Sequence, residues 1–235
     1  MRATYSRLKK IAFRVLALSC VQLLILSAAP AQTSARTDAK ASRRVKGQTL
    51  ISAQLPPVRI KFGKAFRYVG SQRFILYERA QVEQYFFVDA DSRKRIRRMF
   101  MLQFEGYLPG IDGSYNYPQS ETVNLGGESY LANAEIVPGV SAALKQNPQS
   151  DIAHAAALLE GKGYHVNDMI AFQRFVRLVD EAKRNEFILL YIEDLSGAGL
   201  TTSDFTAGGR AAASRREKIL AELSARAQKN FRVLK

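Results

Sequence analysis

Residues 97–108 read RRMFMLQFEGYL, and this alternating stretch decides the class of fold that the chain adopts. A period of two over twelve residues is typical of a long, half-buried β-strand. One face carries Phe100, Leu102, Phe104 and Leu108, and the other carries Met99, Met101, Gln103, Glu105 and Tyr107. A polar connection at 89–95 separates this strand from the apolar run 84–88. We therefore expect an antiparallel hairpin over residues 82–108.

Further elements extend outward from this hairpin in both directions. Apolar or alternating runs predict strands at 74–77, 121–125, 129–136, 170–179 and 187–192, the last covered on both faces. A helix is expected to begin at Ser150 or Asp151 and to end near Gly161. A second helix of about 20 residues is expected from Ala211, with its apolar stripe reaching Phe231 and Leu234. The order predicts an α+β fold: a mainly antiparallel sheet with a mid-chain helix and a long C-terminal amphipathic helix packed on it.

The N-terminus has the features of a secretory signal peptide. The first fourteen positions include five basic residues and no acidic residue. An apolar run follows at 15–26, and small residues end the segment. The apolar run is too short for a spanning helix, although a retained anchor stays open as an alternative. We expect residues 1–31 to be removed by cleavage between Ala31 and Gln32. The mature protein would then be periplasmic or extracellular.

The net charge of +14 is concentrated outside the predicted folded part. Residues 66–235 carry a net charge of only +2, which does not favour nucleic-acid binding. Residues 32–57 are basic and lack apolar periodicity, so they are predicted to be a disordered tether that contacts membranes at most weakly. The remaining residues, 58–235, are expected to form a single α+β domain.

Several classes of site are disfavoured by the residue types available. The only cysteine, Cys20, lies in the predicted signal peptide, so the mature chain has no disulfide and no thiol chemistry. His154 and His165 do not have zinc-site spacing, and Asp89 and Asp91 are followed by Arg93 where a calcium loop needs an acid. We therefore predict no metal and no cofactor.

Two sets of residues are candidates for binding. An aromatic set could line a binding mouth; it comprises Tyr107, Tyr115, Tyr117 and Tyr130. A basic set in the hairpin connection could contact an anionic partner; it comprises Arg93, Lys94, Arg95, Arg97 and Arg98. As structural alternatives, the tyrosine rings would only fold over the edge of the sheet, and the basic residues would only form a solvated hairpin connection.

The sequence favours a non-enzymatic exported domain that binds a small apolar ligand or a partner protein of the cell envelope. One alternative is a secreted hydrolase that uses His165 with Asp168, or Glu193 with Asp194. Another is an envelope protein that binds polyanions through its basic residues. The residue pattern leaves all three open and identifies neither ligand nor partner.

Overall fold

The computed structural model describes residues 42–196 and 210–234, and these form two antiparallel sheets and three helices. The smaller sheet, in the order β1-β2-β3-β11, comprises β1 (Arg43–Lys46), β2 (Thr49–Ser52), β3 (Val58–Phe62) and β11 (Phe231–Leu234). The larger has the order β4-β5-β6-β10-β9-β8-β7. Its strands are β4 (Arg67–Leu76), β5 (Ala80–Ala90), β6 (Ile96–Tyr107), β7 (Glu121–Leu125), β8 (Glu128–Pro138), β9 (Met169–Leu178) and β10 (Asn185–Asp194). The helices are α1 (Val140–Gln146), α2 (Asp151–Gly161) and α4 (Arg210–Lys229).

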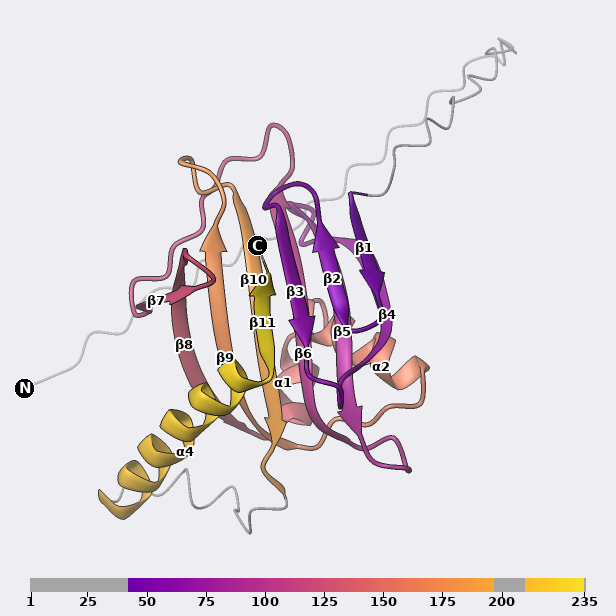
Figure 1. The fold of residues 1–235 in the computed structure, drawn as a ribbon, viewed down its shortest axis with the longest axis vertical. Coiled ribbons are helices and arrows are strands. Elements are labelled where there is room, and N and C mark those ends of the chain that lie inside the picture. Colours follow the sequence, from indigo (N-terminus) through magenta and orange to yellow (C-terminus); the bar gives the residue numbers. More distant parts are fainter. Residues whose placement is uncertain (1–41, 197–209, 235) are drawn as a thin grey trace, which may run out of the picture. The chain divides into compact units, whose positions relative to one another are not determined.

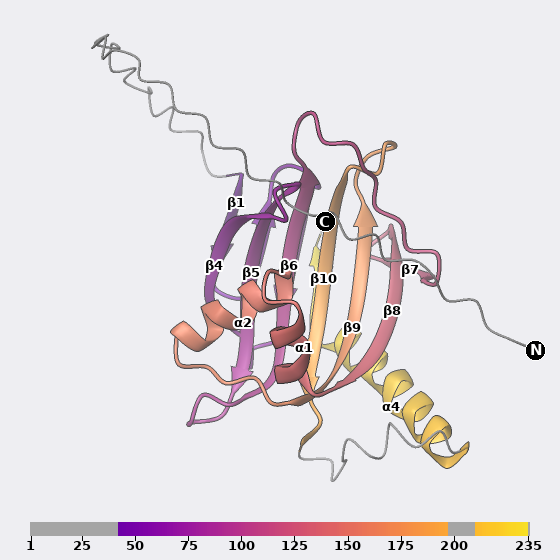
Figure 2. The ribbon, with the colours of Figure 1, turned by 180° about the vertical axis from the view of Figure 1, so that it is seen from behind.

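The seven-stranded sheet forms the middle layer of the fold. The four-stranded sheet and α4 lie on one of its faces, as the front view shows (Figure 1). The short helices α1 and α2 cover the opposite face (Figure 2). This arrangement confirms a mixed α+β fold built on antiparallel sheets. The predicted signal peptide, with Ala31 and Gln32, lies outside the described residues.

The hairpin predicted at 82–108 is present as β5 and β6, with Phe87 opposite Phe100. Phe100 belongs to the core between the two sheets, whereas Met101 belongs to the core beneath α1 and α2. Gln103 is fully buried as well. The strand is thus covered on both faces, not on one as the alternation predicted, because the second sheet and the helices supply a layer each.

Aromatic rings fill the core between the sheets. Phe100 lies at its centre, with ring centroids 4.8 Å from Phe62, 4.9 Å from Phe66 and 4.8 Å from Tyr191. The rings are tilted relative to one another, which is a preferred geometry for aromatic pairs. These contacts join the four-stranded sheet to the central strands β6 and β10.

The prediction of a disordered tether over residues 32–57 is wrong for residues 43–52. This segment forms β1 and β2, and Leu50 is fully buried in the inter-sheet core. The folded part accordingly begins before residue 58, because β1 pairs with β2 and β2 pairs with β3. The basic composition was misleading because a charged side chain in this segment is used inside the fold: Arg43 makes an ion pair with Glu83 at 2.8 Å.

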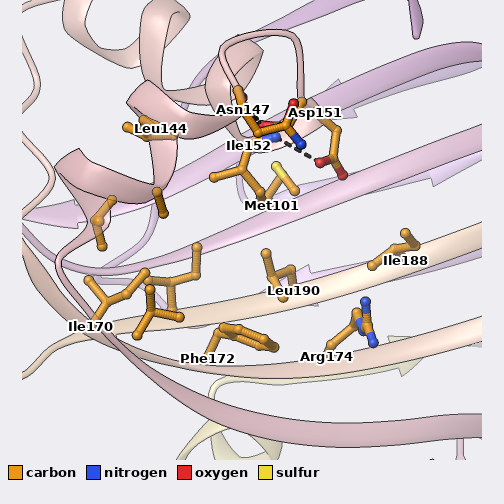
Figure 3. A pocket seen from close by; sticks show the side chains of 15 residues that line it. Met101, Leu144, Asn147, Asp151, Ile152, Ile170, Phe172, Arg174, Ile188 and Leu190 are labelled. Atoms are coloured by element: carbon orange, nitrogen blue, oxygen red, sulfur yellow. Dashed lines mark hydrogen bonds between the residues drawn. The ribbon is translucent and has the colours of Figure 1, made fainter. Parts of the chain in front are cut away.

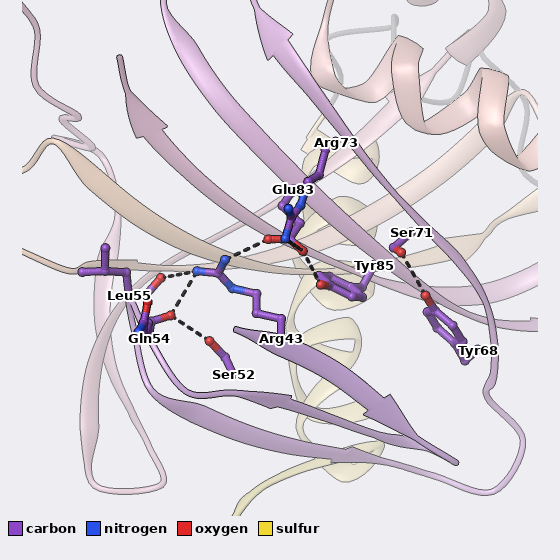
Figure 4. Close-up of polar contacts among 9 residues, drawn as sticks. All are labelled: Arg43, Ser52, Gln54, Leu55, Tyr68, Ser71, Arg73, Glu83 and Tyr85. Atoms are coloured by element: carbon purple, nitrogen blue, oxygen red, sulfur yellow. Dashed lines mark hydrogen bonds and ion pairs between the residues drawn. The ribbon is translucent and has the colours of Figure 1, made fainter. Parts of the chain in front are cut away.

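Glu83 is the centre of a network that fastens the N-terminal strands to the large sheet (Figure 4). It accepts from Arg43 on β1, from Arg73 on β4 at 2.9 Å, and from the Tyr85 hydroxyl. Burial alone would raise the pKa of Glu83, but the hydrogen bonds from Tyr85 and Arg73 and the nearby cations hold it below its ordinary value. The carboxylate therefore stays charged and bound.

We expect Arg43→Met to lower the free energy of unfolding by about 2 kcal/mol, since a charge-assisted hydrogen bond to the buried carboxylate of Glu83 is lost. The side chain also donates to the carbonyl oxygens of Gln54 and Leu55, which would lose that partner. Urea denaturation measures the effect. Arg44→Met is the matched control, because Arg44 is exposed on the same strand and should change stability little. Equal effects of the two substitutions would show that the network does not hold β1.

The C-terminal helix begins as predicted but ends earlier. α4 ends at Lys229, and the Asn230 side chain donates to the carbonyl oxygen of Arg226 at 2.8 Å. The next residues form β11, where Phe231 pairs with Phe62, so the prediction that the helix includes Phe231 and Leu234 is wrong. No helix in the described ranges is long and apolar enough to cross a membrane.

Candidate functional site

A pocket of about 350 Å³ lies between α1, the start of α2 and the covered face of the seven-stranded sheet (Figure 3). We call it the α1–α2 pocket. Its walls are mostly apolar and comprise Met101, Val137, Val140, Ala143, Leu144, Ile152, Ile170, Phe172, Ile188, Leu190 and Ile192. The polar residues that line it are Asn147, Ser150, Asp151 and Arg174. Its volume lies within the usual range for small-molecule sites.

Strand alternation supplies the floor of the pocket. Leu190 on β10 stands opposite Met101 on β6 and opposite Arg174 on β9, so these three side chains form one row across the sheet. Ile188 and Ile192 lie two residues away on the same strand and face the same side. The consecutive apolar residues of β10 are thus explained by burial on both faces.

The two helices are fixed over the sheet at their N-terminal ends. Gly139 has a positive φ of 84° and precedes α1, where Ser141 N–H donates to Asp168 Oδ1 at 2.7 Å. Ser150 caps α2, with its hydroxyl oxygen accepting from Ala153 N–H at 3.1 Å. The first contact fixes the start of α1, and the second fixes the start of α2 beside the turn between the helices.

A ladder of side-chain amides runs beside the start of α2, formed by the half-buried Gln72 and the fully buried Gln84 and Gln103. Gln72 Nε2 donates to Gln84 Oε1 at 2.6 Å, and Gln84 Nε2 donates to Gln103 Oε1 at 2.6 Å. Gln103 Nε2 in turn donates to Asp151 Oδ2 at 3.1 Å and to Glu105 Oε2 at 2.6 Å. The ladder therefore connects three strands to the first residue of α2.

Two glutamates lie directly opposite each other beyond the ladder: Glu105 on β6, which is half-buried, and Glu186 on β10, which is buried. Tyr115 donates to Glu105 at 2.9 Å, and Tyr117 donates to Glu186 at 2.6 Å. Burial raises the pKa of Glu186 to about 8; the Tyr117 hydrogen bond opposes this rise. Burial also raises the pKa of Glu105. The pair can thus hold a proton at neutral pH.

Arg174 is the only cation among the residues that line the α1–α2 pocket. Its Nε donates to Asn133 Oδ1 at 2.8 Å, and its guanidinium carbon lies 5.0 Å from the centre of the Tyr117 ring. Within the described ranges, its terminal nitrogens make no hydrogen bond or ion pair. Figure 3 shows Arg174 and Asp151 on opposite walls of the same end of the pocket.

A second, more polar pocket of about 700 Å³ adjoins Arg174 at the edge of the large sheet. We call it the edge pocket. It is lined by Asn116, Tyr117, Pro118, Gln119, Ser120, Asn133, Ala134, Glu135, Arg174 and Arg216. Arg174 and Asn133 belong to strands, whereas the segment 116–120 belongs to the loop after β6. Arg174 therefore stands between an apolar and a polar pocket.

No family model, curated protein or solved structure matches this chain.

Of the predicted aromatic set, three members gather at one place and one does not. Tyr107 and Tyr115 pack with ring centroids 4.8 Å apart, and Tyr117 packs against the core beneath the helices. Tyr107 ends β6, and Arg184 holds the loop that carries Tyr115 and Tyr117 by donating to the carbonyl oxygen of Ile111 at 2.7 Å. Tyr130 is buried in the inter-sheet core, on the other face of the sheet.

The predicted basic set is largely neutralised within the hairpin connection. Arg97 and Arg98 both pair with the buried carboxylate of Asp89, and Arg95 pairs with Asp91 at 2.8 Å. Burial opposes ionisation of Asp89, but hydrogen bonds from Arg98 and Arg97 hold its pKa below the ordinary value. Lys94 Nζ donates to the carbonyl oxygen of Lys162 at 2.8 Å, and Arg93 is exposed.

The residues considered for acid–base chemistry make other contacts. His154 stacks on Phe74 with ring centroids 3.9 Å apart. His165 is exposed and pairs through its backbone with Arg95, and no hydrogen bond joins it to Asp168 in the described part of the chain.

The acidic pair at the end of β10 also has structural partners. Glu193 accepts from Arg226 of α4 at 2.8 Å, and Asp194 accepts from the Ser196 hydroxyl at 2.9 Å. Glu193 thereby links the end of β10 to α4. Among residues 42–196 and 210–234, no group of three or more His, Cys, Asp or Glu is placed to hold a metal ion.

Sequence reasoning missed Arg174, Asp151 and Glu186. Alternation along β9 places Arg174 on the same face as Ile170 and Phe172, a polar interruption that is visible in the sequence. Gln103 and Glu105 interrupt the helix-covered face of β6 in the same way. That these positions meet at one end of a pocket depends on the order of the strands, which residue patterns do not give.

Proposed function

We propose that this protein is an exported, non-enzymatic domain that binds a small, mainly apolar ligand in the α1–α2 pocket. The observation that carries the proposal is the pocket itself: an apolar space of about 350 Å³ whose polar residues gather at one end. An apolar body would be removed from water there at a gain of roughly 25 cal/mol per Å² of buried surface. A few polar groups would fix its orientation, as is usual in small-molecule sites.

Export is part of the proposal and rests on the basic, apolar and small-residue order of residues 1–31. We also propose that the helix at 210–229 is amphipathic. Leu223 and Ala227 of α4 are buried against the sheets, while residues 213–218 are exposed. A helix of this kind would cover the core between the two sheets and leave the α1–α2 pocket, on the other face, as the site for a ligand.

The neutral dye N-phenyl-1-naphthylamine, which fluoresces in apolar surroundings, tests the pocket. We expect saturable binding to the purified protein and at least a roughly tenfold weaker affinity for Ala143→Trp. Ala143 lines the pocket from a solvent-accessible position of α1, so the indole would occupy ligand space at little cost to folding.

Ala142→Trp is the matched control. Ala142 is the preceding, exposed residue of α1 and does not line the pocket. It should bind the dye like the unmodified protein. Absence of saturable binding by the unmodified protein, or equal loss in the two variants, would refute the proposed site.

A further inference from the structure

We propose that the ligand carries a carboxylate head that binds to Arg174 while its apolar body fills the α1–α2 pocket. This inference rests on the function proposed above and names the chemical class of the ligand: a small amphipathic carboxylate. The geometry that points to it is the place of Arg174 between the apolar α1–α2 pocket and the polar edge pocket.

The first argument is the uncompensated charge of Arg174. Its side chain is half-buried, yet no carboxylate lies within ion-pair distance of it in the described ranges. Taking a charge from water without a partner is costly, and folded proteins usually provide one. Other half-buried arginines of this fold have partners, such as Arg43 with Glu83 and Arg98 with Asp89. An anionic ligand would supply the missing partner for Arg174.

The second argument is the orientation of the guanidinium. Asn133 accepts from Nε at 2.8 Å and the Tyr117 ring lies 5.0 Å from the guanidinium carbon, so the group is held at two sides. The terminal nitrogens retain their donors, and a planar guanidinium binds a carboxylate with two parallel hydrogen bonds. A fixed guanidinium loses less conformational freedom when it binds the anion.

The nearby carboxyl groups do not cancel this preference for an anion. Asp151 Oδ1 accepts from Ile152 N–H at 2.8 Å, and Oδ2 accepts from Gln103. Its charge also lies at the N-terminus of α2, where the helix dipole stabilises it. Glu105 and Glu186 are hydrogen-bonded to Tyr115 and Tyr117. Because burial raises the pKa of Glu186 to about 8, this carboxyl is mainly neutral at pH 7.

Three probes with the same eight-carbon chain separate the candidates for the head group: octanoate, octan-1-ol and octylammonium. Each is measured by its displacement of N-phenyl-1-naphthylamine at pH 6.5. We expect octanoate to bind at least about tenfold more tightly than octan-1-ol, and octylammonium to bind most weakly. Tightest binding of octylammonium would overturn the inference, because the acidic groups would then govern recognition.

Two arginines of the same strand provide the variant and its control. Arg174→Gln should abolish the preference for octanoate over octan-1-ol and leave octan-1-ol binding unchanged. Arg177→Gln should keep the preference, since Arg177 is paired with Glu128 at 2.9 Å and does not line the α1–α2 pocket. A preference that survives in Arg174→Gln would overturn the inference. Failure of the proposed function is distinguishable, because the dye itself would then not bind.

The affinity advantage of octanoate over octan-1-ol should depend on pH. It would not do so if Arg174 had only a structural role. Between pH 6.5 and 9, Glu186 loses its proton and becomes an internal anion near Arg174, alongside Glu105 on β6, Asp151 on α2 and Tyr117 of the loop. We expect the advantage of octanoate over octan-1-ol to fall severalfold across this range. An advantage that grows with pH would overturn the inference.

Discussion

Phe100→Ala is expected to lower the free energy of unfolding by about 3–5 kcal/mol, one of the two largest effects that we predict. Phe100 is fully buried, and its ring contacts Phe62 of β3, Phe66, Tyr191 of β10 and Phe231 of β11. Its removal would leave a cavity where strands of both sheets meet. Since domains are stable by only about 5–15 kcal/mol, the variant would lose a large part of its stability.

Urea denaturation of the purified protein measures this loss. Phe74→Ala is the matched control, because Phe74 is only half-buried on the edge strand β4 and stacks on His154. We expect it to cost about 1 kcal/mol. If Phe100→Ala does not fold, Phe100→Leu replaces it, with an expected loss of about 1–2 kcal/mol. A loss no greater than that of Phe74→Ala would show that this ring does not join the sheets.

The part of the fold that residue patterns could predict is the part governed by local periodicity. The hairpin of β5 and β6, the Gly126-Gly127 turn between β7 and β8 and the Ser150 cap of α2 all follow from neighbouring residues. Patterns failed where distant partners decide the structure. Residues 43–52 lack an apolar run of strand length, yet they form strands because β3 and Glu83 lie beside them. Phe231 continues the four-residue spacing of Leu223 and Ala227, yet pairing with Phe62 places it in a strand.

The same division applies to the candidate site. The composition of the loop after β6 indicates a cluster of tyrosines, and Tyr115 and Tyr117 donate to Glu105 and Glu186. Tyr130 shares their residue type but lies on the opposite face of the sheet. The sequence shows Arg174 only as a polar residue in an apolar strand. Its importance comes from the lack of a carboxylate partner for it in the described part of the chain. Such a deficit can be recognised only when the neighbours in space are known.

The second large effect concerns Glu186 and the dependence of stability on pH. Burial, with Glu105 and Asp151 nearby, raises the pKa of Glu186 from an ordinary 4.5 to about 8, against the opposing effects of Tyr117 and Arg174. Between these values the folded protein holds a proton that the unfolded chain releases. Stability from this group is therefore complete below about pH 4.5 and is lost as the pH rises to about 8.

We expect Glu186→Gln to remove this loss, because the amide keeps an acceptor for Tyr117 but does not titrate. Relative to the unmodified protein, the variant should gain on the order of 2–5 kcal/mol of unfolding free energy between pH 5 and pH 9. Urea denaturation at pH 5, 7 and 9 provides the measurement, and taking the difference cancels the titration of groups that do not interact with Glu186. Glu135→Gln, an exposed position on β8, is the matched control and should show no such gain. A difference between the Glu186 variant and the unmodified protein that stays constant with pH would mean that Glu186 is ionised in the fold, in which case Arg174 would have an anionic neighbour without any ligand.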